Sequence, residues 1–221
     1  MKKIGIFLFS LSLIASGAAF GAAKELEIRG KKLISQRPAF ALTLPSEFRL
    51  VHSSSVENRS ENSLTRTFVF VKEKKQVEEM MIIQVADKTN PQAGPMTVPP
   101  LKPYTDKRMY MKGKTKKKEV EIDYLVQLMA WNPEAPSLQP LIKKGITLPS
   151  HWALQGQILF VSDFEHGVFI RYSKDVNSFG FKVSAEGEDW NKGSISGNQK
   201  TAFEAFQKIF TEMMDSLQIK D

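Results

Sequence analysis

The sequence contains no cysteine and only three histidines among its 221 residues. Without cysteine the chain cannot be a disulfide-stabilised scaffold, use a thiol nucleophile, or hold zinc or an iron–sulfur cluster through thiolates. The lipid-modified cysteine of bacterial lipoproteins is absent as well. The histidines, His52, His151 and His166, are scattered along the chain and form no metal-binding spacing. These absences exclude several classes of enzyme and metalloprotein.

Common catalytic motifs are also missing. The chain has no Gly-x-Gly-x-x-Gly, no P-loop and no His-Glu-x-x-His. Residues 193–197, Gly-Ser-Ile-Ser-Gly, resemble the nucleophile elbow of hydrolases, but Ile195 occupies the position that the nucleophilic serine needs. We therefore expect a protein that is not an enzyme and has no cofactor. An uncharacterised hydrolase-type enzyme is kept as an alternative.

The N-terminal segment is the most specific signal in the sequence. Lys2 and Lys3 precede 20 uncharged residues, 4–23, which start apolar and end in small residues. This order is typical of a secretory signal peptide, and we expect cleavage after Ala23 or after Gly21. A single membrane anchor is the alternative, because 20 uncharged residues are just enough to span a bilayer. The short basic leader predicts a bacterial protein of the periplasm or the extracellular space.

Residues 24–221 are predicted to form one domain. Hydrophobic residues make up 42% of the sequence, which excludes a disordered chain. A chain of this length buries roughly 70% of its unfolded surface, so it needs no covalent crosslink. Beyond the leader we expect no transmembrane segment.

Runs of apolar and alternating residues predict a largely antiparallel sheet. The expected strands are 24–35, 40–44, 64–71 and 80–85, a hairpin of 108–112 and 120–131 with its turn near 113, and a meander of 157–164, 168–172 and 178–185. Residues 52–63 are polar and predict a loop. A proline-rich, basic excursion is expected over about 89–149, with a short helix at 137–144.

The chain is expected to end in an amphipathic helix of about 17 residues. Its apolar stripe consists of Phe203, Phe206, Phe210, Met213 and Leu217. Thr201 and Glu204 match a capping box, and Asn198 is a rival cap. One such helix must cover a sheet face. The predicted class is α+β, a mostly antiparallel sheet packed by the C-terminal helix.

Two parts of the chain resemble the PsbP-like family, the extrinsic proteins of the oxygen-evolving complex and their bacterial relatives. One is the Phe-x-Leu-x-Leu-Pro strand at 40–45, and the other is the closing helix that ends in Ser216-Leu217. The resemblance implies an α/β/α sandwich and a non-enzymatic accessory role. It carries over no functional residue, because the family shares no catalytic motif.

A basic segment is the main candidate for partner binding. Residues 102–118 carry a net charge of +7, whereas the whole mature chain carries only +5. The candidate binding residues are Tyr104, Lys107, Arg108, Tyr110, Lys112, Lys114, Lys116, Lys117 and Lys118. The leader argues against nucleic acid, so the expected partner is an acidic protein or an anionic envelope surface. The alternative is a solvated hairpin whose lysines face Glu119, Glu121 and Asp123 across the strands.

Two further hypotheses remain open. Asp163, Glu165 and His166 are the candidates for a metal or acid–base site, but these residue types are also ordinary in turns, and we expect no metal. Phenylalanine and methionine residues suggest a carrier of an apolar ligand, bound in a cleft between helix and sheet. The leading prediction is a non-catalytic exported binding or accessory protein.

Overall fold

A computed structural model describes residues 25–104, 109–132, 134–135, 138–149, 152–179 and 197–220. Its strands are β1 (Leu26–Arg29), β2 (Lys32–Gln36), β3 (Ala39–Thr43), β4 (Arg49–Asn58), β5 (Ser63–Glu73), β6 (Val77–Lys88), β7 (Tyr110–Lys117), β8 (Val120–Ala130), β9 (Trp152–Val161), β10 (His166–Asp175) and β11 (Gln218–Ile219). Its helices are α1 (Gln139–Ile142) and α2 (Gly197–Asp215).

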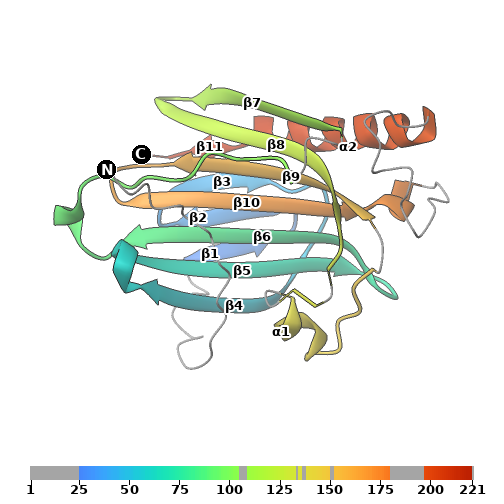
Figure 1. The fold of residues 1–221 in the computed structure, drawn as a ribbon, viewed down its shortest axis with the longest axis horizontal. Helices are drawn as coiled ribbons and strands as arrows, with labels where there is room; N and C mark the ends of the chain where they lie inside the picture. The colour runs from blue at the N-terminus through green and yellow to red at the C-terminus, as the bar shows by residue number, and fades with distance from the viewer. Residues whose placement is uncertain are drawn as a thin grey trace, which may run out of the picture.

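The strands form two antiparallel sheets. The large sheet has the order β4-β5-β6-β10-β9-β8-β7, and the small sheet has the order β1-β2-β3-β11. The small sheet and α2 lie together on one face of the large sheet (Figure 1). The predicted α+β class with a mostly antiparallel sheet is therefore confirmed, and so is the helix that covers it.

The main core lies between α2, the small sheet and the inner face of the large sheet. Phe206 of α2 stacks on Tyr172 of β10, with ring centroids 5.4 Å apart, and on Phe210, with centroids 6.4 Å apart. Gly156 of β9 makes room for this helix, because a Cβ there would lie 2.8 Å from Cγ of Phe210. The apolar stripe predicted from the sequence is thus the face that α2 buries.

The proline-rich excursions cover the outer face of the large sheet. Leu141 of α1 is fully buried in a cluster with Val69 and Val71 of β5. The segment 89–104 runs over the other strands, where Leu101 packs on Leu125 and Leu159. Both faces of the large sheet are therefore in contact with other parts of the chain, which explains the continuous apolar runs in its central strands.

The predicted loop at 52–63 is wrong, because most of it forms β4. This strand is an edge of the large sheet, and its side chains are largely half-exposed, so its sequence is polar. The hairpin turn is also misplaced. Gly113 lies within β7 and leaves space for the ring of Tyr124, and the chain turns at Lys118, which has a φ of 51°. Local apolarity and glycine content were therefore poor guides at these two places.

Two details at the C-terminal end also differ from the prediction. Residues 178 and 179, the first two of the expected strand at 178–185, belong to a 3-10 helix over Val176–Phe179; residues 180–185 lie outside the described residues. The helix already includes Gly197, so Thr201 lies inside it and donates to the carbonyl of Gly197 at 2.9 Å, and neither predicted cap is used. No helix in the described part of the chain is long and apolar enough to span a bilayer.

Candidate functional site

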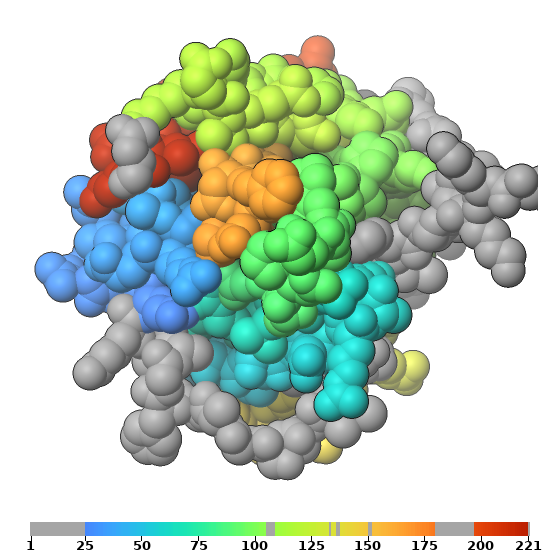
Figure 2. Space-filling model, turned by 90° about the vertical axis from the view of Figure 1, so that its left-hand side faces the viewer, coloured from blue at the N-terminus to red at the C-terminus, as the bar shows by residue number. Residues whose placement is uncertain are grey.

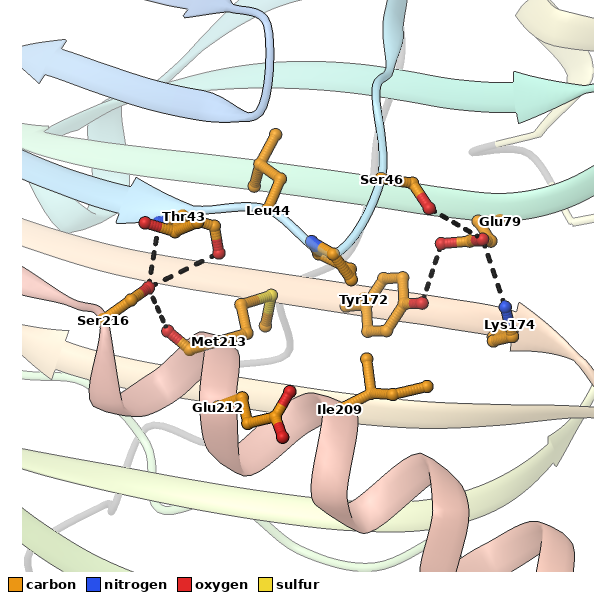
Figure 3. A pocket seen from close by; sticks show the side chains of 11 residues that line it. Thr43, Leu44, Ser46, Glu79, Tyr172, Lys174, Ile209, Glu212, Met213 and Ser216 are labelled. Atoms are coloured by element: carbon orange, nitrogen blue, oxygen red, sulfur yellow. Dashed lines mark hydrogen bonds and ion pairs between the residues drawn. The ribbon is translucent and has the colours of Figure 1, made fainter.

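A pocket of about 320 Å³ opens between α2 and the large sheet (Figure 3). On one side it is lined by Thr43 at the end of β3 and by the residues through which the chain then leaves the small sheet, Leu44, Pro45 and Ser46. Its lining residues are Thr43, Leu44, Pro45, Ser46, Glu79, Tyr172, Lys174, Ile209, Glu212, Met213 and Ser216. We call this space the helix–sheet pocket.

The end of α2 is tied to β3 at one side of this pocket. The backbone N–H of Thr43 donates to Oγ of Ser216 at 2.9 Å, and that hydroxyl donates to the carbonyl of Met213 at 2.7 Å. The strand β11 then pairs with β3. These bonds fix the distance between helix and small sheet, so the wall of the pocket is part of the folded framework.

The other side of the pocket holds a buried charge cluster, which we call the Glu79 cluster. The side chain of Glu79 is 1% exposed, and its Oε1 accepts from Ser46 at 3.0 Å, Lys72 at 2.9 Å and Lys174 at 3.1 Å. Its Oε2 accepts from the hydroxyl of Tyr172 at 2.8 Å. A buried carboxylate is stable only when it is paired in this way.

The environment keeps the Glu79 carboxylate ionised. Burial by itself raises the pKa of Glu79, but the hydrogen bond from Lys72, the charge of Lys174 and the bonds from Tyr172 and Lys174 outweigh burial and lower it. Burial and the neighbouring carboxylate raise the pKa of Tyr172, so its phenol stays protonated. The polar wall of the pocket is therefore a fixed arrangement of charges and dipoles at neutral pH.

The rest of the lining is mostly apolar. Leu44 and Pro45 come from the chain after β3, and Ile209 and Met213 come from α2. The Glu79 cluster lies at one end of the pocket in Figure 3, and the apolar side chains lie beside it. A concave site with apolar walls and a few convergent polar groups is suited to a small molecule that has a polar end.

The basic hairpin predicted from the sequence is β7–β8. Tyr110 pairs with Gln127, whose side chain accepts from the backbone N–H of Tyr104 at 2.7 Å. The two tyrosines thus lie near each other, with Tyr104 76% exposed and Tyr110 42% exposed. Lys112, Lys114 and Lys116 alternate along the same face of β7. Lys107 and Arg108 lie outside the described residues.

Much of this positive charge is neutralised by acidic residues of the hairpin itself. Lys114 forms ion pairs with Glu121 and with Asp123, and Lys116 pairs with Glu119 at 2.8 Å. Lys112 donates to the carbonyl of Leu101 and Lys117 to that of Asp215, and Lys118 forms the turn. The acids that follow the basic segment therefore neutralise part of its charge, as expected for the alternative of a solvated hairpin.

The turn at 163–166 brings together two of its three candidate residues. Oδ1 of Asp163 lies 2.7 Å from Nδ1 of His166 and also accepts the backbone N–H groups of Glu165 and His166. Burial raises the pKa of Asp163, but these hydrogen bonds outweigh burial and lower the pKa. Glu165 instead faces Arg37, at 4.0 Å.

Distant residues pack against the same turn. Nε of Arg37 donates to Nε2 of His166 at 3.0 Å, and Oδ1 of Asp87 lies 3.4 Å from that nitrogen. Arg66 holds Asp87 through two bonds of 2.9 and 3.0 Å. In Figure 2 the tip of the β9–β10 hairpin, in orange, lies between the small sheet, in blue, and the green segment after β6. Asp163 thus holds Nδ1 of His166 within the turn, and Nε2 contacts the distant segments through Arg37 and Asp87.

The other candidates are dispersed. His52 lies on the edge strand β4, where burial and then the charge of Lys144 lower its pKa. His151 lies outside the described residues. Most methionines of the described chain fill cores, but Met213 also lines the pocket. No group of three or more potential metal ligands is found in the described part of the chain.

Sequence reasoning missed the Glu79 cluster. One signal was available, because Glu79 alternates with Met81, Ile83 and Val85 and so belongs to the inward face of its strand. Lys174 likewise continues the inward series of β10 through Tyr172. A charged residue in register with an apolar face indicates a buried ion pair or a site.

No family model matches this chain, and no curated protein matches it either. The function is therefore argued from the geometry of the pocket and of the hairpin.

Proposed function

We propose that this is a non-catalytic binding protein that holds a small amphipathic molecule in the helix–sheet pocket. The observation that carries the proposal is the pocket itself, in which the buried Glu79 cluster faces apolar side chains of α2 and of the chain after β3. Such a site binds a molecule that has one polar and one apolar part. This is the carrier hypothesis from the sequence, with an amphipathic ligand in place of a wholly apolar one.

Binding fits this site better than catalysis. The carboxylate of Glu79 is already held by four donors, and the phenol of Tyr172 stays protonated. General acid–base work needs a group that exchanges a proton near the working pH. The carboxylate of Glu79 and the phenol of Tyr172 are instead held in one protonation state, which suits recognition.

Blocking the pocket tests the proposal. Ile209→Trp places a large ring in the pocket, whereas Lys208→Trp places the same ring at the neighbouring exposed position of α2, which does not line it. Native mass spectrometry of protein purified from its own host should show a bound small molecule on the wild type and on Lys208→Trp, and none on Ile209→Trp. Wild-type protein without any retained molecule, and without measurable binding of added amphiphiles, would refute the function.

The proposal places the protein outside the cytoplasm. Its basis is the basic, apolar and small-residue order of residues 2–23. The intact mass of protein recovered from the periplasm or medium should correspond to a chain that begins at residue 22 or 24. A full-length mass in the membrane fraction would instead support the anchor.

A second candidate function is docking of an acidic partner or an anionic envelope surface on β7–β8. The exposure of Tyr104 and Tyr110 beside the alternating lysines favours it. A triple Lys→Gln variant at 112, 114 and 116 should elute at lower salt from an anionic column and bind anionic vesicles less, while Lys200→Gln on α2 should behave as wild type. Equal retention of the triple variant would eliminate this candidate, which the internal ion pairs already weaken.

A relationship to the PsbP-like family stays part of the proposal. It is supported by the small sheet that contains the 40–44 strand and by the closing helix. The described residues place α2 against one face of the large sheet and the four-residue α1 against the other, an arrangement compatible with an α/β/α sandwich. The accessory, non-enzymatic role of that family agrees with a binding function.

A further inference from the structure

We propose that the ligand of the helix–sheet pocket carries an anionic head group, a carboxylate or a phosphate, which Lys174 binds. The inference rests on the proposed binding function and specifies its ligand class. It follows from which polar groups of the pocket still have hydrogen-bonding capacity, and from the sign of their charge.

The Glu79 carboxylate is closed to a ligand. A carboxylate offers about four acceptor positions on its two oxygens. Ser46, Lys72 and Lys174 already reach Oε1, and Tyr172 reaches Oε2. The one acceptor position that remains is on Oε2, and the side chain is only 1% exposed, so a cationic or hydrogen-bond-donating head group has little access to it.

Lys174, in contrast, has donor capacity left. An ammonium group has three N–H groups, and among the described residues Lys174 donates to Glu79 and lies 5.3 Å from the centroid of the Phe179 ring. Its side chain is 16% exposed and lines the pocket, so the remaining capacity is accessible from there. A charged acceptor is the partner that uses it best, because a charge-assisted hydrogen bond is stronger than a neutral one.

The charge beside Lys174 points the same way. Lys72, which does not line the pocket, and Lys174 together outweigh Glu79 and leave the cluster with one positive charge. The carboxylate of Glu212 offsets this charge, but it lines the pocket from the side of α2. An anion therefore fits at the Lys174 end, with its apolar part along Leu44 and Met213 and away from the Glu212 carboxylate.

The two lysines offer a matched pair of variants. Both form an ion pair with Oε1 of Glu79, at 2.9 Å for Lys72 and 3.1 Å for Lys174, but only Lys174 lines the pocket. Lys72→Met and Lys174→Met therefore remove the same charge from the same carboxylate. Only the second variant removes the group that meets the ligand.

The experiment uses four probes with the same eight-carbon chain: octanoate, octyl phosphate, octan-1-ol and octylammonium. Each is titrated into purified wild-type protein at pH 7 and followed by calorimetry. The two anions should bind at least about tenfold more tightly than the alcohol, the ratio expected when a charge-assisted hydrogen bond is made or lost. Comparison of octanoate with octyl phosphate then shows which head group is preferred.

Lys174→Met should abolish the preference for the anions, and Lys72→Met should keep it within about threefold of wild type. Glu212→Gln should tighten anion binding, because it removes a like charge from the lining. If octan-1-ol or octylammonium binds wild type as tightly as octanoate does, the anionic head group is wrong although the binding function stands. If no probe binds and the purified wild-type protein carries no bound small molecule, the binding function fails as well. The four titrations of the wild-type protein test the anionic head group even if a variant does not fold.

Discussion

Replacing Glu79 by glutamine tests the Glu79 cluster most directly. The substitution keeps the size of the side chain and removes only its charge and two acceptor positions. Lys72, at 38% side-chain exposure, can turn towards water, but Lys174, at 16%, cannot do so easily. The amide NH₂ group would also replace one carboxylate oxygen, so it would face donors for which it cannot act as an acceptor.

The expected loss of stability is about 2–4 kcal/mol. One buried hydrogen bond to a charged group contributes roughly 1.5–3 kcal/mol, and removal of one partner of a buried pair costs about 3–5 kcal/mol. Because Lys72 is partly exposed and can be solvated when the pair is broken, the expected loss lies below the upper end of the range for buried pairs. Such a loss is large for a domain whose total stability is on the order of 5–15 kcal/mol.

Chemical denaturation at a series of pH values checks both the size of this stability loss and its electrostatic cause. The pKa of Glu79 is lowered in the folded state, so its contribution is complete above the ordinary value of 4.5 and is lost as the pH falls through the folded pKa. The difference between wild type and Glu79→Gln should therefore be largest at pH 7 and shrink in acid, where the wild-type carboxyl is also neutral. A difference below about 1 kcal/mol at pH 7, or one that does not change with pH, would refute the electrostatic account.

Three further substitutions test the packing around the site. Gly156→Ala should destabilise the protein by about 1–3 kcal/mol or more, measured by thermal unfolding, because the new methyl group overlaps the ring of Phe210. Arg66→Met should cost about 3–5 kcal/mol in denaturant unfolding, since it leaves the largely buried Asp87 without its two hydrogen bonds. Leu141→Ala should cost about 2–5 kcal/mol and expose the outer face of the sheet to proteolysis near α1.

Controls and contrary outcomes are available for each of these. Gly197→Ala should be neutral, because a Cβ there meets nothing within 4 Å among the described residues; equal effects at 156 and 197 would contradict the contact with Phe210. Arg29→Met, at an exposed ion pair, should change stability by less than about 1 kcal/mol. If Leu141→Ala leaves both stability and proteolysis unchanged, α1 does not protect the outer face.

The sequence predicted those elements in which the spacing of the apolar residues matches the pattern of buried positions. The stripe of α2 follows the helical period because one face of the helix lies in the main core, whereas β5 and β6 have continuous apolar runs because both of their faces are covered. The strand β4 could not be found in this way. It is an edge strand, and most of its side chains contact water on at least one side, so its composition is that of a loop.

The pocket was not predictable from any local pattern. Its lining comes from the end of β3, from β6, from β10 and from the last turns of α2, which only the fold brings together. The basic hairpin is the opposite case, because charges adjacent in sequence become neighbours across β7 and β8. There the sequence left two interpretations open, and the ion pairs of the structure show which acids pair with which lysines.

The pairing of β11 with β3 affects when the protein completes its fold during synthesis. Thr43 and Ser216 are 173 positions apart, and Lys220 donates its backbone N–H to the carbonyl of Ala39. Most strands of the large sheet pair with a neighbour in sequence and can assemble as they emerge from the ribosome, but α2 and β11 arrive last. Until α2 and β11 emerge from the ribosome, the part of the inner sheet face that α2 covers therefore stays exposed, which leaves time for a holding chaperone to bind it.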